Sequence, residues 1–236
     1  MISAKTKQEF LNGEMILIDK PLEWTSFQVV NKVRWLLRKQ FNLRRIKVGH
    51  AGTLDPLATG LLILCVGKFT KKIEQYQAQD KEYTGTILLG ATTPSYDAET
   101  EVDKTFPTDH IDEALIDEAV QKFIGTIQQK PPIFSALKRD GKRLYEYARK
   151  GEEVDIPTRE IRIESFEITR FALPEIDFRV VCSKGTYIRS LAHDFGKAVQ
   201  SGGYLTALRR TKIGSFDVEN SQSLEEIEAY IKSLEQ

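Results

Sequence analysis

The sequence has no apolar run long enough to span a membrane, and its N-terminus lacks the apolar core of a signal peptide. Only two cysteines occur in 236 residues, Cys65 and Cys182, and each lies in an apolar, strand-like run. With three histidines they show no metal-ligand spacing, so neither a disulfide framework nor a metal site is predicted. A reducing, cytoplasmic setting is therefore expected.

Net charge is absent as well, because 34 Lys and Arg balance 34 Asp and Glu. The charges are nevertheless segregated along the chain. Seven basic residues and no acid lie between Asn31 and Lys47, seven more face two acids between Lys130 and Lys150, and residues 97–118 hold nine acids and one Lys. Two basic blocks favour a polyanionic ligand such as nucleic acid. The alternative is a solvated charged face.

One loop offers candidate reactive groups. Residues 49–62, GHAGTLDPLATGLL, are rich in glycine and lead into the apolar run Leu61–Val66, which is typical of a buried strand. A loop next to such a strand is held by the scaffold, so its carboxylate, Asp55, and its imidazole, His50, are candidates for chemistry. Alternatively, Asp55 is a turn residue or helix cap before Pro56, and His50 is structural.

Hydrophobic periodicity predicts an α+β fold. Hairpin-type connections outnumber clear βαβ units, so the strands are expected to be mostly antiparallel. Expected strands cover residues 14–19, 61–66, 81–90, 161–171 and 176–183, and an extended segment covers 130–141. Expected helices cover 27–37 (capped by Thr25 or Ser26, with Phe27 among its apolar positions), 69–77, 111–123, 144–150, 187–199 and 224–234. Without repeats or linkers, a single domain is expected.

Six ordered pieces of this sequence resemble one family, the bacterial tRNA pseudouridine synthases of the TruB type. The pieces are LIDKP at 17–21, GHAGTLDPLATG at 49–60, KEY at 81–83, PPIFSALK at 131–138, CSKGTYIR at 182–189 and LRRT at 208–211. The family isomerises uridine 55 in the TΨC arm of tRNA. The resemblance implies a central mixed, mostly antiparallel sheet flanked by helices, an active-site cleft across the sheet, and neither a metal nor an organic cofactor.

The resemblance assigns Asp55 as the catalytic nucleophile, Arg189 as its ion-pair partner, and Tyr83 as the aromatic ring that stacks on the target base. A carboxylate can attack the base at C6 or the sugar at C1′, or take a proton at C2′. A guanidinium opposes the rise in pKa that burial would cause in Asp55. Stacking offsets part of the cost of flipping the uridine out. The alternatives are a surface ion pair for Arg189 and a core aromatic for Tyr83.

Five further residues are implied at the substrate. His50 helps to fill the gap left by the extracted nucleotide, and Leu208 packs under the base. Tyr187 and Lys20 line the same site, and Asp97 lies near the cleft. Structural alternatives are a satisfied histidine for His50, plain core for Leu208, and a turn that supports the loop for Lys20.

Basic residues around the loop are expected to contact RNA phosphates. These are Arg34, Arg38, Lys68, Lys71, Arg209 and Arg210. The acidic stretch 97–118, apart from Asp97, is expected to face away from RNA. The expected partner is tRNA, bound through its TΨC stem-loop. No membrane or metal partner is expected, and the enzyme is expected to be a monomer.

Two features depart from the family pattern. Phe134 stands where related enzymes commonly carry Tyr. Many relatives continue into a C-terminal RNA-binding domain of the PUA type, whereas twenty residues follow Phe216 here. We therefore expect one catalytic domain over residues 1–236, with its core at about 14–216, a helical extension at 217–236, and no PUA domain. Two alternative functions are an RNA-binding tRNA-folding chaperone on the same scaffold and a pseudouridine synthase that acts on another RNA.

Overall fold

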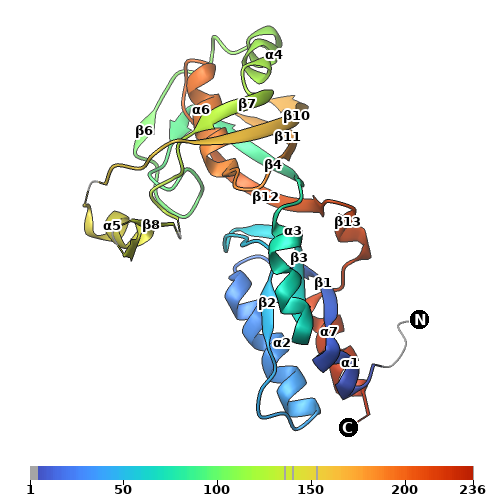
Figure 1. The fold of residues 1–236 in the computed structure, drawn as a ribbon. Coiled ribbons are helices and arrows are strands. Elements are labelled where there is room, and N and C mark those ends of the chain that lie inside the picture. Colours follow the sequence, from blue (N-terminus) through green and yellow to red (C-terminus); the bar gives the residue numbers. More distant parts are fainter. Residues whose placement is uncertain (1–4, 136, 140, 153, 236) are drawn as a thin grey trace. The chain divides into compact units, whose positions relative to one another are not determined.

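The computed structural model of the chain describes residues 5–135, 137–139, 141–152 and 154–235. Ala136 and Asp140, in the segment expected to be extended, lie outside the described residues. The chain forms two compact units. The first unit holds the residues up to Tyr83 and those from Arg209 onward, and the second unit holds Thr84–Leu208. Two strands, β4 (Lys81–Leu89) and β12 (Gly203–Ile213), contribute residues to both units (Figure 1).

The first unit is a small sheet with helices packed on it. Its strand order is β1–β3–β12, with β2 against β3 and β13 against β12. Strands β1 and β2 both run antiparallel to β3. The elements are α1 (Lys7–Asn12), β1 (Glu14–Lys20), α2 (Ser26–Gln40), β2 (Val48–His50), β3 (Ala58–Val66), the 3₁₀ helix η1 (Gly67–Lys72), α3 (Ile73–Gln77), β13 (Phe216–Asp217), η2 (Val218–Asn220) and α7 (Leu224–Ser233).

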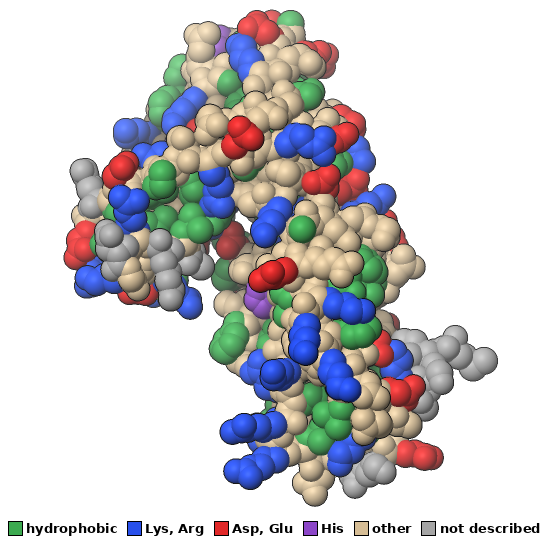
Figure 2. All heavy atoms as spheres, in the orientation of Figure 1, with side chains coloured by type: hydrophobic (Ala, Val, Ile, Leu, Met, Phe, Trp, Pro, Cys, Tyr) green, Lys and Arg blue, Asp and Glu red, His purple; other side chains and the backbone are tan. Residues whose placement is uncertain are grey.

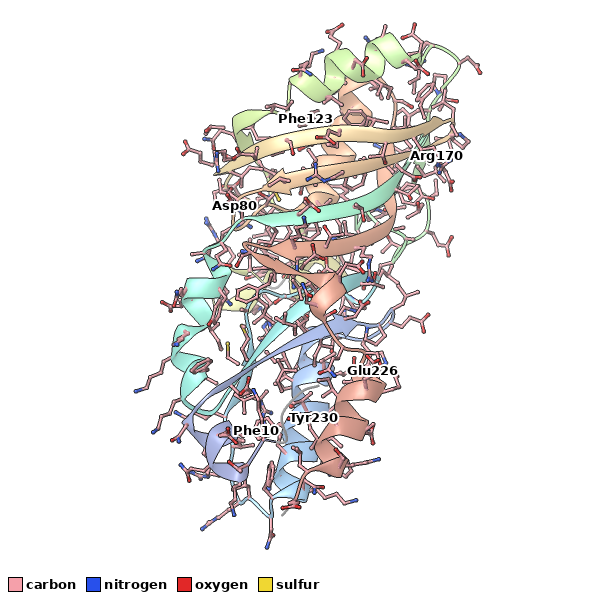
Figure 3. All side chains as sticks on the ribbon, turned by 90° about the vertical axis from the view of Figure 1, so that its right-hand side faces the viewer. Phe10, Asp80, Phe123, Arg170, Glu226 and Tyr230 are labelled. Atoms are coloured by element: carbon pink, nitrogen blue, oxygen red, sulfur yellow. The ribbon has the colours of Figure 1, made fainter. Side chains whose placement is uncertain are left out.

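Strand β3 is apolar from Leu61 to Val66, where both of its faces are buried. Leu62 and Leu64 join a core formed with α1, α2 and α7, while Leu61 lies in a second core with side chains from α3 and β13. Phe10 of α1 lies in the first core, and Tyr230 of α7 is partly buried and packs against it (Figure 3). A strand buried on two faces needs a continuous apolar run, which explains why residues 61–66 show no alternation.

Helix α2 is capped by Thr25, one of the two residues expected to cap it, and the cap is a capping box. The Thr25 hydroxyl accepts from the Gln28 N–H at 3.1 Å, and the Gln28 side chain accepts from the Thr25 N–H at 2.8 Å. The buried stripe of the helix includes Val29, Val30 and Val33. The assignment of Phe27 to this stripe is wrong, because its side chain is 64% exposed.

The second unit is built on the strand order β12–β4–β11–β10–β7. Strand β10 is antiparallel to both β11 and β7. The Phe166 ring lies 5.9 Å from Phe178 and 5.4 Å from Phe195 in its core. Arg170 donates to Asp177 near the end of the β10–β11 hairpin (Figure 3). The remaining elements are β5 (Ala91–Thr92), β6 (Lys104–Thr105), α4 (Glu113–Gln121), β7 (Gly125–Gln129), β8 (Lys138–Arg139), β9 (Lys142–Arg143), α5 (Leu144–Lys150), β10 (Arg159–Ala172), β11 (Glu175–Cys182) and α6 (Ile188–Ala198).

The predicted α+β class, with mostly antiparallel strands flanked by helices, is confirmed. The strands expected at 14–19, 61–66, 81–90, 161–171 and 176–183 correspond to β1, β3, β4, β10 and β11. Strands β7 and β12 escape the sequence patterns, and β12 matters more because it carries Leu208, Arg209 and Arg210. None of the helices in the described ranges has the length and apolar character needed to cross a membrane.

Candidate active site

Asp55 lies in the loop between β2 and β3, and its side chain is half-buried. The Asp55 carbonyl accepts from the Ala58 N–H at 3.1 Å, which closes a turn. On the preceding side, the Ser26 hydroxyl accepts from the Leu54 N–H at 2.8 Å and donates to the Leu54 carbonyl at 3.1 Å. Asp55 is therefore a turn residue, but the turn uses its carbonyl, so the two interpretations of this residue are compatible.

Arg210 of β12 holds the loop from a second direction. Its guanidinium is 1% exposed and donates to the carbonyls of Leu61 at 2.8 Å, Gly52 at 3.1 Å and Thr53 at 3.4 Å. Gly60 makes this close packing feasible. Its φ is +100°, and a Cβ there would lie 2.3 Å from the Arg210 carbonyl oxygen, so only glycine fits.

Lys20, the last residue of β1, holds the loop from a third direction. Its side chain is fully buried, and its ammonium donates to the carbonyls of Pro21 at 2.8 Å, Trp24 and Pro56 at 3.4 Å. Since Pro56 follows Asp55 directly, both sides of Asp55 are fixed. Burial lowers the pKa of Lys20 to about 8, while the charge of Asp55 opposes that decrease.

His50 and Tyr83 belong to the same unit. His50, the last residue of β2, is half-buried. Burial and the positive charge of Arg210 lower the pKa of His50, which favours the neutral form of its imidazole. Tyr83 of β4 is 8% exposed. Its burial resembles that of a core aromatic, and its stacking on a base stays a prediction.

The second unit contains a cluster around Arg189, in the first turn of α6. Arg189 is 5% exposed, and its Nε lies 3.5 Å from Asp97 Oδ2. Its two terminal nitrogens donate to the carbonyls of Ser95 at 3.2 Å and Phe134 at 2.8 Å. Asp97 is buried too, and its Oδ1 accepts from the Glu99 N–H at 3.0 Å. Because this ion pair is buried, the surface-pair alternative for Arg189 is wrong.

The start of α6 is also tied to the end of β7 and to the residue that follows it. The Gln129 amide accepts from the Tyr187 N–H at 2.8 Å and donates to the Tyr187 carbonyl at 3.0 Å. The Ser190 hydroxyl donates to the Lys130 carbonyl at 2.8 Å. The Arg159 guanidinium lies 4.6 Å from the centre of the Tyr187 ring, a cation–π contact. Both the backbone and the ring of Tyr187 are therefore fixed.

Four residues predicted to contact RNA phosphates gather in the first unit. Arg34, Arg38, Lys68 and Lys71 all line a surface groove of about 480 Å³, bounded by α2, residues 44–47 and η1. Lys and Arg side chains are dense over this part of the molecule (Figure 2).

Comparison with protein families shows to which family the chain belongs. The model for the N-terminal domain of TruB family pseudouridylate synthases matches residues 38–188. The chain belongs to the TruB family. The model for the tRNA pseudouridylate synthase B C-terminal domain matches residues 189–236. The family predicted from the sequence is confirmed.

Curated TruB relatives align along nearly their whole length. The tRNA pseudouridine synthase B of Flavobacterium johnsoniae is 66% identical over 217 residues, which cover 92% of this chain and 95% of the relative. That of Phocaeicola vulgatus is 53% identical over 226 residues, 96% of each chain. A chain in the crystal structure of a Cbf5-Nop10-Gar1 complex is 28% identical, with a TM-score of 0.70 over 97% of this chain. This chain spans 61% of that one.

The predicted TruB site residues fall into two groups. The first unit holds Asp55, His50, Lys20 and Tyr83, and the second unit holds Arg189, Tyr187, Asp97 and Leu208. The pairing of Arg189 with Asp55 joins residues of different units and stays a prediction. Leu208 is half-buried, so plain core does not describe it.

The structure bears on two predictions for this TruB chain. Arg210 does not offer its charge to phosphates, because its buried guanidinium is committed to three carbonyls. The buried ammonium of Lys20 is bonded to backbone, which favours the supporting-turn alternative, and its contact with the substrate stays a prediction. Arg209 is half-exposed and pairs with Asp19 at 2.7 and 3.0 Å, and its contact with phosphate stays a prediction.

Ser26 supports the Asp55 loop, a role that the sequence did not predict. Thr25 and Ser26 were both candidate caps of α2. Thr25 is the cap, which leaves the Ser26 hydroxyl to bond to Leu54. Gln129 and Arg159, which fix Tyr187, carry no comparable signal because they are distant in sequence.

The pKa of Lys20 predicts a pH dependence of stability. Between pH 8 and 10.5 the unfolded chain binds the Lys20 proton and the folded chain does not, so raising the pH favours folding. Over this range the free energy of unfolding of the wild type should rise by about 3 kcal/mol relative to Lys20→Met. Urea unfolding of both proteins at a series of pH values measures the difference in unfolding free energy. The contributions of other titrating groups cancel because both proteins contain them. A constant difference would contradict it.

Proposed function

We propose that this chain isomerises uridine 55 in the TΨC arm of tRNA to pseudouridine. The curated relatives named above are tRNA pseudouridine synthases, and the chain covers nearly all of their length. The observation that carries the proposal is the fixed position of Asp55: Ser26, Arg210 and Lys20 hold the backbone before and after it. A reactive group needs such a rigid support.

Asp55 is the nucleophile in this proposal. The N1–C1′ bond of uridine breaks, the uracil turns, and a C5–C1′ bond forms. The proton leaves C5 and N1 gains one, so the reaction is redox-neutral. Attack at C6, attack at C1′ and removal of the C2′ proton are three routes that all use the Asp55 carboxylate.

The lowered pKa of His50 fits its proposed place in the RNA. An imidazole that fills the gap left by a flipped nucleotide is surrounded by stacked bases and loses its water. A charged ring would pay a desolvation penalty there, whereas a neutral ring does not. Burial and the charge of Arg210 lower the pKa of His50, which favours the neutral ring.

Mapping pseudouridine in an unmodified tRNA transcript tests the proposal. Incubation with the enzyme should produce pseudouridine at position 55 and at no other uridine. A transcript with cytidine at position 55 is the matched control and should stay unmodified. Modification at other positions, or none in the first transcript, would contradict the proposal.

Mapping pseudouridine in total RNA from a deletion strain tests the choice of substrate. The tRNA TΨC position should lose its modification in that strain, and plasmid-borne enzyme should restore it. If this position stayed modified while another RNA lost pseudouridine, the alternative substrate would be correct.

We further propose that residues 1–236 form a single catalytic domain that acts as a monomer in the cytoplasm. Light scattering after size exclusion should give a mass near 26.9 kDa, the mass of one chain. Twice that mass at micromolar concentration would contradict the monomer.

A further inference from the structure

The groove on the first unit is far more basic than the four predicted phosphate contacts imply. Residues 44–47 add Arg44, Arg45 and Lys47 to its lining. Seven of its eleven lining residues are therefore Lys or Arg, and none is Asp or Glu. Leu11 and Ile46 add apolar surface, and Gly67 and Thr70 complete the lining.

These charges are not compensated by the protein. No carboxylate in the described part of the chain forms an ion pair with any of the seven, whereas Lys32 pairs with Glu228 and Arg209 pairs with Asp19 in the same unit. The bonds the seven do make go to neutral acceptors, for example from Lys68 to the Asn12 side chain at 3.2 Å. Six of the seven are exposed, so their charges face solvent.

Arg34 is the one residue of the seven that is not exposed, and hydrogen bonds hold its guanidinium in place. It is half-buried, and it donates to the Asn31 side chain at 2.7 Å and to the Val48 carbonyl at 2.9 Å. The groove thus has one fixed guanidinium among six exposed cations. Its lining includes no residue of the Asp55 loop, although Lys47 is adjacent in sequence to β2, which leads into that loop.

We propose that this groove binds the sugar–phosphate backbone of tRNA, as a contact surface separate from the Asp55 loop. The inference rests on the proposed function. Phosphates are the ligand that uncompensated Arg and Lys side chains fit best, and four of the seven are Arg, whose planar fork matches phosphate oxygens. Phosphate contacts carry no sequence information of their own, so a groove that binds the backbone would position the tRNA on the enzyme.

A triple variant, Arg44→Gln with Arg45→Gln and Lys47→Gln, tests this proposal. The matched control is Lys7→Gln with Lys104→Gln and Lys122→Gln, which removes the same charge from exposed positions outside the groove. Binding of unmodified tRNA is measured over a range of salt concentrations. Loss of three phosphate contacts should lower the slope of log affinity against log salt by about 2 to 3. Affinity at low salt should fall about tenfold or more, with a matching rise in KM.

The outcomes separate this proposal from the function on which it rests. If the wild type makes no pseudouridine in tRNA, the proposed function fails. If the wild type is active and the triple variant binds tRNA with the slope of the control, the groove proposal fails alone. Loss of binding to a polyglutamate peptide with unchanged tRNA affinity would make the groove a protein-docking surface and would also overturn it. A reduced kcat with unchanged Kd would assign these residues to the chemical step, against the proposal.

Discussion

Asp55→Asn is expected to abolish pseudouridine formation while tRNA binding survives. The amide keeps the shape of the side chain, and the turn uses the Asp55 carbonyl, so the loop should keep its conformation. An amide nitrogen and oxygen cannot form the covalent intermediate or take a proton as a carboxylate does, so the rate should fall by about 10⁴-fold or more. Release of tritium from C5-labelled uridine measures the rate, and filter binding measures Kd.

The pKa of Lys20 is a second measurement that tests Asp55→Asn. The negative charge of Asp55 raises the pKa of Lys20, so its removal should lower that pKa further below about 8. The matched control is Asp109→Asn, which changes the same group at an exposed position. Normal turnover by Asp55→Asn would refute the assignment of the nucleophile. If Asp55→Asn loses turnover because it does not fold, its urea unfolding curve will show this. Asp55→Glu, which keeps the negative charge, then tests whether the carboxylate must lie at one position.

Arg210→Met and Arg209→Met should differ strongly although the two residues are neighbours. Removing the buried Arg210 guanidinium leaves the carbonyls of Gly52, Thr53 and Leu61 without this donor, which should cost about 3 kcal/mol of unfolding free energy. Arg209 is half-exposed in its pair with Asp19, so its loss should cost less than about 1 kcal/mol. Urea unfolding of the two variants measures the difference.

Arg210→Met should also lose more activity than Arg209→Met. Without Arg210 the loop loses one of its three supports, so turnover should fall even under conditions where the variant is folded. Arg209→Met should keep most of the turnover and lose affinity at most a few-fold, as expected for one phosphate contact. Equal stability losses in the two variants would show that Arg210 does not support the loop.

Elements with local signals could be predicted from the sequence. Helix α2 has its capping box at Thr25, and α5 ends at Gly151, whose φ of +67° suits glycine. Strand β12 could not be predicted, because its buried position 210 is an arginine and its exposed positions include Ala207. A charged residue at a core position breaks the alternation from which a half-buried strand is recognised.

The candidate site was predicted mainly through resemblance. Local chemistry allows Asp55 to be a simple turn residue, and only the family motif predicts that it is the nucleophile. Its supports were not predictable, because the bond from Arg210 to Gly52 joins residues 158 positions apart. Similarly, the buried pair of Arg189 with Asp97 depends on how α6 packs in the second unit. Such contacts are decided by tertiary structure, and no pattern of neighbours in the sequence contains them.

Helix α2 has a consequence for how a uridine is chosen. Ser26 in its first turn bonds to Leu54, next to Asp55, and Arg38 in its last turn lines the basic groove. The two residues are twelve positions apart in the helix, a distance of about 18 Å along its axis. The helix thus sets a fixed spacing between the support of Asp55 and the basic groove. With phosphates held in the groove, the reacting nucleotide would be selected by distance along the backbone as well as by the identity of the base.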